Sequence, residues 1–220
     1  MSLELKKRII TSIFLLSLLV LMFFYTYILI IGVIIISVIS WIEFYNLISR
    51  IFLKKNFTEK MLQFFYKFLS LSYLSFLIFL ILFVEVNNSE LKIFIIYSIL
   101  VSILSDLGGI TIGRIFKGKK LTKISPKKTI SGSLGSFIFS LFLIPFFFKD
   151  LLSHEFLLLF LITIIISLFS QMGDLFISFL KRRAKVKDTS NLLPGHGGIL
   201  DRIDGIIFAI PTGFFLLNYF

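Results

Sequence analysis

Long apolar runs alternate with short polar loops along this 220-residue chain. A helix that crosses a membrane needs about 20 mainly apolar residues. The first run, residues 9–48, is about twice that length, so we predict a helical hairpin that turns near residues 25–27. Five further runs each predict one span: 61–84, 91–115, 132–148, 156–181 and 199–217. The pattern therefore predicts an all-α integral membrane protein, a polytopic bundle of about seven transmembrane helices.

The distribution of charge tests this count of spans. With the N-terminus placed in the cytoplasm, every Lys and Arg falls in a cytoplasmic loop or at its edge except Lys92 and Lys149. Such an asymmetry is typical of membrane proteins and predicts a cytoplasmic N-terminus and an external C-terminus. The net charge of +11 is therefore better explained by anionic lipid head groups and anionic substrates than by nucleic acid. The chain has no Cys, which excludes disulfides and thiolate chemistry.

The same count predicts how the chain is divided. Residues 1–90 form an N-terminal region of three spans, and residues 91–220 form a catalytic transmembrane region. The catalytic region contains two basic loops with Gly or Pro, residues 114–131 and 182–198. Both loops are expected on the cytoplasmic face, so we expect them to meet.

Polar residues form a stripe near the end of the sixth predicted span. Gln171, Asp174, Ser178 and Lys181 are spaced by three, four and three residues, which places them on one helix face. One interpretation is hydrogen bonding to a neighbouring helix. The other is a functional site, because an Asp is costly to bury in a membrane.

The seventh predicted span begins with Asp201, Arg202 and Asp204. We expect Asp201 and Asp204 on one helix face. Carboxylates are favoured at a helix N-terminus, so capping is one explanation. The other is that Asp174 and Asp201, on adjacent helices, hold a hard cation such as Mg²⁺, which prefers oxygen ligands.

A glycine-rich turn, LPGHGG at residues 193–198, precedes that helix. Gly195, Gly197 and Gly198 permit positive φ and close approach of the backbone to a ligand. Amide groups at the following helix start are able to bind phosphate. His196 is the one His in this region, and its hydrogen-bond partner is either a phosphate or the base; the residues do not decide which.

The fourth predicted span and its loop, residues 105–129, supply a third element. Three glycines there, Gly108, Gly109 and Gly113, allow close helix packing. The motif SPKKT at 125–129 adds two Lys and two hydroxyls. Together the loops resemble a triphosphate-binding surface, which indicates metal-assisted phosphoryl or nucleotidyl transfer. A transporter with a buried acid relay and a non-catalytic membrane protein are the alternatives.

Four spaced motifs resemble the signature of the phosphatidate cytidylyltransferase (CDP-diacylglycerol synthase) family. They are SxLKR at 178–182, KDxS at 187–190, LPxHGG at 193–198 and DRxD at 201–204. SPKKT resembles the upstream conserved segment of the same family. One departure lies at Ser131, where the family usually has Glu.

The resemblance implies that CTP and phosphatidate react to give CDP-diacylglycerol and pyrophosphate. It implies that Asp174 and Asp201 hold Mg²⁺ with K⁺ as a companion cation, supported by Asp188 and Asp204. It also implies a multi-pass protein of the inner (cytoplasmic) membrane whose active site faces the cytoplasm. A homodimer is a further expectation from the family.

The phosphate-binding residues implied by the resemblance are cationic or hydroxylic: Ser178, Lys181 and Arg202. Further candidates for triphosphate or lipid head-group contacts are Arg114, Lys127, Lys128, Gly197 and Gly198. The enzymatic alternative is a CTP-dependent lipid-alcohol kinase, which transfers the γ-phosphate instead of CMP.

Overall fold

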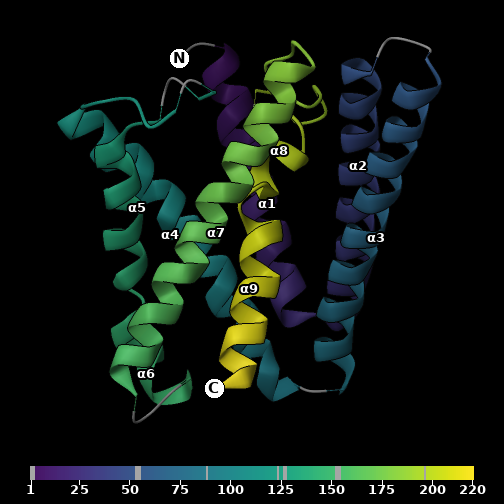
Figure 1. The fold of residues 1–220 in the computed structure, drawn as a ribbon. Coiled ribbons are helices and arrows are strands. Elements are labelled where there is room, and N and C mark those ends of the chain that lie inside the picture. Colours follow the sequence, from purple (N-terminus) through teal and green to yellow (C-terminus); the bar gives the residue numbers. More distant parts are fainter. Residues whose placement is uncertain are drawn as a thin grey trace. The chain divides into compact units, whose positions relative to one another are not determined.

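The computed structural model describes residues 3–52, 56–87, 89–122, 124–125, 128–151, 155–195 and 197–220. Within these residues the secondary structure is helical, and the β contacts present are isolated bridges, so the all-α prediction is confirmed. The helices, coloured along the chain in Figure 1, are α1 Leu3–Phe24, α2 Thr26–Ile51, α3 Phe57–Asn87, η1 Ser89–Leu91, α4 Lys92–Phe116, α5 Ile130–Leu141, α6 Ile144–Leu151, α7 Phe156–Arg183, α8 Leu200–Ile203 and α9 Ile206–Tyr219.

Several helices have the length and composition of membrane spans. In the described part of the chain these are α2, α3, α4 and α7, and the bent pair α5 and α6 counts as a fifth if it forms one span. The predicted hairpin is present, because α1 ends at Phe24 and α2 begins at Thr26. The structure thus supports a multi-pass membrane protein with four or five such spans.

Two predicted spans are broken in the structure. The fifth bends by 51° between α5 and α6. Pro145 explains the bend, since its ring would clash with the carbonyl of Leu141, where α5 ends. The seventh is divided into α8 and α9, and the side chain of Asp204 accepts a hydrogen bond from the amide of Gly205 at the break (3.0 Å). Such local bonds compete with the helical hydrogen-bond ladder.

The chain divides into two compact units. One contains residues 1–85 and 180–203, and the other contains residues 86–179 and 204–220. Most of the predicted signature, residues 180–203, therefore belongs to the same unit as the N-terminal helices, whereas Ser178 and Asp204 belong to the other unit. The predicted division at residue 90 concerns function and stays a prediction.

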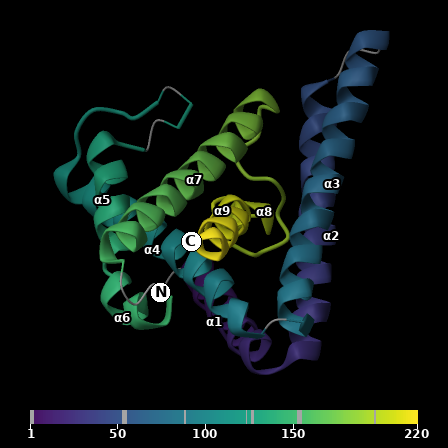
Figure 2. The same cartoon turned by 60° about the horizontal axis from the view of Figure 1, so that its bottom comes forward.

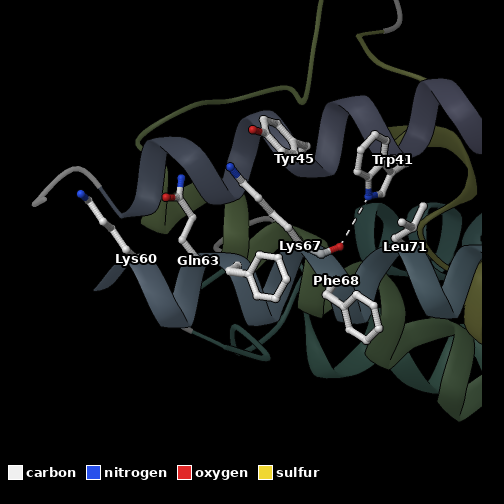
Figure 3. A pocket seen from close by; sticks show the side chains of 8 residues that line it. Trp41, Tyr45, Lys60, Gln63, Lys67, Phe68 and Leu71 are labelled. Atoms are coloured by element: carbon white, nitrogen blue, oxygen red, sulfur yellow. Dashed lines mark hydrogen bonds between the residues drawn. The ribbon is translucent and has the colours of Figure 1, made fainter. Parts of the chain in front are cut away.

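In the unit of residues 1–85 and 180–203, α2 and α3 run side by side in both views (Figure 1, Figure 2). A hollow of about 340 Å³ lies on this pair, and Figure 3 shows side chains that line it. There the Lys67 ammonium lies 3.4 Å from the centre of the Tyr45 ring, and the Trp41 indole donates to the Lys67 carbonyl (3.5 Å). Trp41 and Tyr45 are one turn apart, so Glu43 lies on the opposite face of α2.

In the other unit, α4 packs against α5 through small residues. A Cβ added to Gly132 would lie 2.7 Å from the carbonyl oxygen of Gly109, which is too close for any side chain. The prediction that glycines in this span allow close helix packing is therefore confirmed. Buried hydroxyl pairs join α4 to α7: Ser102 with Ser170 at 2.7 Å, and Ser105 with Ser167 at 3.0 Å.

Candidate active site

Asp201 in α8 is the centre of a hydrogen-bond network in the unit of residues 1–85 and 180–203. Its Oδ1 accepts from the Lys181 ammonium at 2.7 Å. Its Oδ2 accepts from the Thr189 amide (2.8 Å), the Thr189 hydroxyl (2.9 Å) and the Gly198 amide (3.0 Å). The side chains of Lys181 and Asp201 are only 14% and 5% exposed, so the ion pair is largely shielded from water.

The surroundings of Asp201 change its acidity. Burial raises the pKa of this carboxyl, but the hydrogen bond from Lys181, the two amide hydrogen bonds and the charge of Lys181 lower it by more. The net pKa lies below the usual value of an aspartate. Asp201 is therefore a carboxylate at neutral pH and is fixed in orientation by its donors.

The glycine-rich turn folds back on itself. Leu193 and Gly197 exchange two backbone hydrogen bonds, of 2.8 and 3.1 Å. Gly195 and Gly197 have φ of +79° and +87°, which confirms that the turn needs glycines in the left-handed region. His196 lies outside the described residues.

The amides after this turn bind carboxylates of the protein itself. The Gly198 amide donates to Asp201, and the Ile199 and Leu200 amides donate to Glu43 in α2. In this structure these amides are therefore taken by carboxylates, and phosphate binding by them stays a prediction. Gly198 also has a packing role, because a Cβ there would lie 2.6 Å from Glu43 Oε1.

Glu43 was not identified by sequence reasoning. It is 3% exposed, and both carboxylate oxygens accept hydrogen bonds from residues 189–200. The sequence did contain a signal for Glu43, because an acidic residue inside an apolar run is costly to bury unless it has partners. Its partners lie about 150 residues further along the chain, so sequence spacing gave no indication of them.

A polar hollow of about 610 Å³ lies beside this network in the same unit. Cationic, acidic and glycine residues line it: Lys187, Asp188, Asn191, Leu193, Pro194, Gly195, Gly197 and Arg202. Three of the predicted site residues, Asp188, Gly197 and Arg202, are thus brought together. The mixture of cations and backbone amides is typical of sites that bind phosphate.

The polar stripe on α7 is confirmed in the unit of residues 86–179 and 204–220. Asp174 forms an ion pair with Lys128, and Ser178 donates to Asp174 Oδ1 at 3.3 Å. Gln171 accepts from Ser133 of α5 at 2.6 Å. Gln171 thus joins two helices, as the first interpretation predicts, whereas the functional interpretation of Asp174 stays a prediction.

The loop between α4 and α5 is tied to the start of α5. The Thr129 hydroxyl accepts from the Gly132 amide (3.0 Å), and Ser131 donates to the Lys117 carbonyl (2.7 Å). Ser131, where the family usually has Glu, thus anchors the loop to the end of α4. Arg114 is exposed near that end of α4, and Lys127 lies outside the described residues.

Asp204 does not share a helix face with Asp201, contrary to the sequence-based expectation. α8 ends at Ile203, so Asp204 lies in the turn before α9 and is 7% exposed. Its carboxylate binds the amide of Gly205. The prediction was wrong because the helix that was expected to carry both residues is broken between them.

The two predicted metal ligands belong to different compact units, and among the described residues no group of three or more His, Asp or Glu is arranged to hold a metal. The donor chemistry fits a hard cation nevertheless. Asp201 Oδ1 and both oxygens of Asp174 each accept one hydrogen bond or ion pair, and a carboxylate oxygen has two lone pairs. Each therefore keeps a lone pair for Mg²⁺.

Known proteins resemble this chain. A family model described as "Cytidylyltransferase family" matches residues 2–220. The phosphatidate cytidylyltransferase of Staphylococcus haemolyticus is 47% identical over 121 residues, covering 54% of this chain and 46% of the relative. The phosphatidate cytidylyltransferase of Bacillus subtilis is 40% identical over 142 residues, which cover 63% of this chain and 53% of the relative. That of Rickettsia felis is 43% identical over 117 residues, which cover 47% of this chain and 49% of the relative. The chain spans about half the length of these relatives. Because the family model covers nearly the whole chain, the protein belongs to the cytidylyltransferase family.

Proposed function

We propose that this protein transfers CMP from CTP to phosphatidate, giving CDP-diacylglycerol and pyrophosphate. The names of its relatives give the substrates, and the Asp201 network carries the proposal. A carboxylate with four donor groups within hydrogen-bond distance, one of them a shielded ammonium, lies in the same unit as a hollow lined by Lys187 and Arg202. Such an arrangement suits a reaction that brings two anions together.

One bond forms and one breaks in the reaction. An oxygen of the lipid phosphate forms a bond to the α-phosphorus of CTP, and the bond from that phosphorus to the oxygen bridging to the β-phosphorus breaks. The lipid phosphate is anionic at neutral pH and needs little help from a base. The barrier lies in the repulsion between anions and in the charge of the departing pyrophosphate, which fixed cations stabilise.

Three residues on the chain are proposed to bind the phosphates. Lys181 and Arg202 supply positive charge, and Ser178 supplies a hydroxyl. Lys181 is held by Asp201 in the structure, so substrate binding would need to share or replace that contact. His196 is proposed to form a hydrogen bond either to a phosphate or to the base.

The remaining predicted residues have supporting roles in the proposal. Asp188 and Asp204 are proposed to support the two aspartates that would hold the metal. Arg114, Lys127, Lys128, Gly197 and Gly198 are proposed near the triphosphate or the lipid head group. For Lys128 the support is its position against Asp174.

Asp174 and Asp201 are proposed to hold Mg²⁺, with K⁺ as a second cation. The support is chemical, since both are carboxylates with oxygen lone pairs left over. When bound, the ions would neutralise charge on the triphosphate and on the leaving pyrophosphate. In their absence Lys128 and Lys181 neutralise the same two carboxylates.

For the membrane arrangement we propose seven spans with a cytoplasmic N-terminus and an external C-terminus. The active site then lies on the cytoplasmic side of the inner membrane, where CTP is available. The support is the charge of the loops, in which Lys92 and Lys149 are the only cations assigned to the outer side. A homodimer is proposed as well, from the resemblance to the family alone.

The test is incubation of the purified protein in detergent with phosphatidate, α-labelled CTP and Mg²⁺. Label should appear in the lipid extract only when all three are present. Replacing phosphatidate with diacylglycerol is the control, because it lacks the attacking phosphate. A wild-type protein that transfers no label to phosphatidate would reject the proposed reaction.

A further inference from the structure

Glu43 lies outside the predicted site, and both of its carboxylate oxygens accept hydrogen bonds. Its Oε1 accepts from the Ser190 hydroxyl (2.6 Å) and the Ile199 amide (3.1 Å). Its Oε2 accepts from the Thr189 hydroxyl (2.7 Å) and the Leu200 amide (2.9 Å). Each oxygen therefore takes one hydroxyl and one backbone amide.

These four bonds hold both ends of one loop. Thr189 and Ser190 lie before the glycine-rich turn, and Ile199 and Leu200 lie after it. A single side chain from α2 thus closes the loop of residues 189–200 at its base. Fixing such a loop costs conformational entropy, which hydrogen bonds to a buried carboxylate offset.

The Thr189 hydroxyl connects Glu43 directly to Asp201. Its oxygen lies 2.7 Å from Glu43 Oε2 and 2.9 Å from Asp201 Oδ2. A hydroxyl has one hydrogen, so it donates to one carboxylate at a time. The amide of the same residue also donates to Asp201, at 2.8 Å. Any movement of Thr189 would therefore be transmitted to Asp201.

We propose that Glu43 is a positioning residue, which acts through Thr189 to fix the orientation of Asp201 and the base of the glycine-rich turn. The inference rests on the proposed function for its effect on catalysis, but its effect on the loop is independent of the reaction. Glu43 does not contact substrate in this scheme. Partners that orient metal ligands typically contribute about 10–100-fold to activity or metal affinity.

The decisive variant is Glu43→Gln, which keeps the size of the side chain. A glutamine has one acceptor oxygen, so its NH₂ group must face the amide of Ile199 or Leu200, which can only donate. We expect hydrogen exchange in residues 189–200 to become at least about tenfold faster, and kcat to fall about 10–100-fold, with KM for CTP little changed. The Mg²⁺ concentration for half-maximal activity should rise.

The matched control is Glu85→Gln in α3 of the same unit, where the carboxylate accepts a hydroxyl hydrogen bond from Thr26 (2.6 Å). Glu85 has no role in the proposed machinery, and the variant should leave both readouts unchanged. A purely structural role of Glu43 would lower the amount of folded protein but not kcat per folded molecule or the Mg²⁺ dependence.

A second pair of variants keeps the test decisive if Glu43→Gln fails to fold. Thr189→Val removes the connecting hydroxyl and keeps the backbone amide, whereas Thr189→Ser restores the hydroxyl. We expect the loss of kcat with Val and its recovery with Ser. Equal activity of Val and Ser variants would overturn the proposal.

The two claims fail in distinguishable ways. An inactive wild-type protein would reject the proposed function, and the hydrogen-exchange comparison would still decide the role of Glu43 in the loop. An active wild-type protein whose Glu43→Gln variant shows unchanged exchange, or unchanged kcat, would overturn the positioning role alone.

Discussion

Replacing Asp201 with Asn keeps the shape of the side chain and removes its charge. The better orientation of Asn places its oxygen where Oδ2 receives three hydrogen bonds, two from Thr189 and one from Gly198. Its NH₂ group then faces the ammonium of Lys181, so two donors meet. The opposite orientation is worse, since the NH₂ group would face two backbone amides.

The expected loss of unfolding free energy follows from the exposure of the Lys181 side chain. Removing one partner of a buried ion pair costs about 3–5 kcal/mol. The Lys181 side chain is 14% exposed and gains some solvation when released, which reduces the expected cost to about 2–3 kcal/mol. A stable domain has about 5–15 kcal/mol to lose, so Asp201→Asn should fold but unfold more easily.

The assay is equilibrium unfolding in detergent, with turnover measured on the same preparation. Asp188→Asn, an exposed acid on the same loop, is the stability control and should change the unfolding free energy by less than about 0.5 kcal/mol. Adding Lys181→Met to Asp201→Asn should recover part of the loss, because the unpaired ammonium is then removed. Turnover should be abolished in Asp201→Asn and in the double variant with Lys181→Met.

Two results would refute this reasoning. A change in unfolding free energy as small as that of Asp188→Asn would mean that the Lys181–Asp201 pair does not stabilise the folded protein. Near-normal turnover of Asp201→Asn would remove Asp201 from the catalytic machinery.

Three further predictions follow from the same structure. Gly198→Ala should destabilise the protein by about 1–3 kcal/mol and accelerate hydrogen exchange of the loop, because its Cβ has no room beside Glu43; wild-type stability would contradict the packing. The lowered pKa of Asp201 stabilises the fold above about pH 4, and this stability should be lost as pH falls through the lowered pKa; in an acid titration Asp201→Asn should lack that component. Lys92 and Lys149 should react with an impermeant amine reagent from outside the cell, and labelling only after lysis would reject the seven-span topology.

The apolar pattern was sufficient to predict the long helices. The turn expected near residues 25–27 lies at the break after Phe24, and the sixth predicted span corresponds to α7. These features depend on local composition, which determines where a helix is able to cross a membrane. The breaks at Pro145 and Asp204 were missed, because both segments are apolar enough to be read as single helices.

The candidate site was predictable where its residues are close in sequence. Asp174 and Ser178 lie one turn apart on α7, and the positive φ of Gly197 follows from the glycine-rich turn. Glu43 was not predictable from spacing, since its partners are contributed by a distant loop. The contact of the Ile199 amide with Glu43 could not be predicted for the same reason.

Parallel reactions with α-labelled and γ-labelled CTP test the central claim most directly. The purified protein is incubated with phosphatidate and Mg²⁺, and label is measured in the lipid and in pyrophosphate. CMP transfer predicts that α-label enters the lipid and that an equal amount of γ-label is released as pyrophosphate, with neither product formed by Asp201→Asn. Transfer of γ-label to a lipid, with CDP as the second product, would show a kinase and contradict the proposed function.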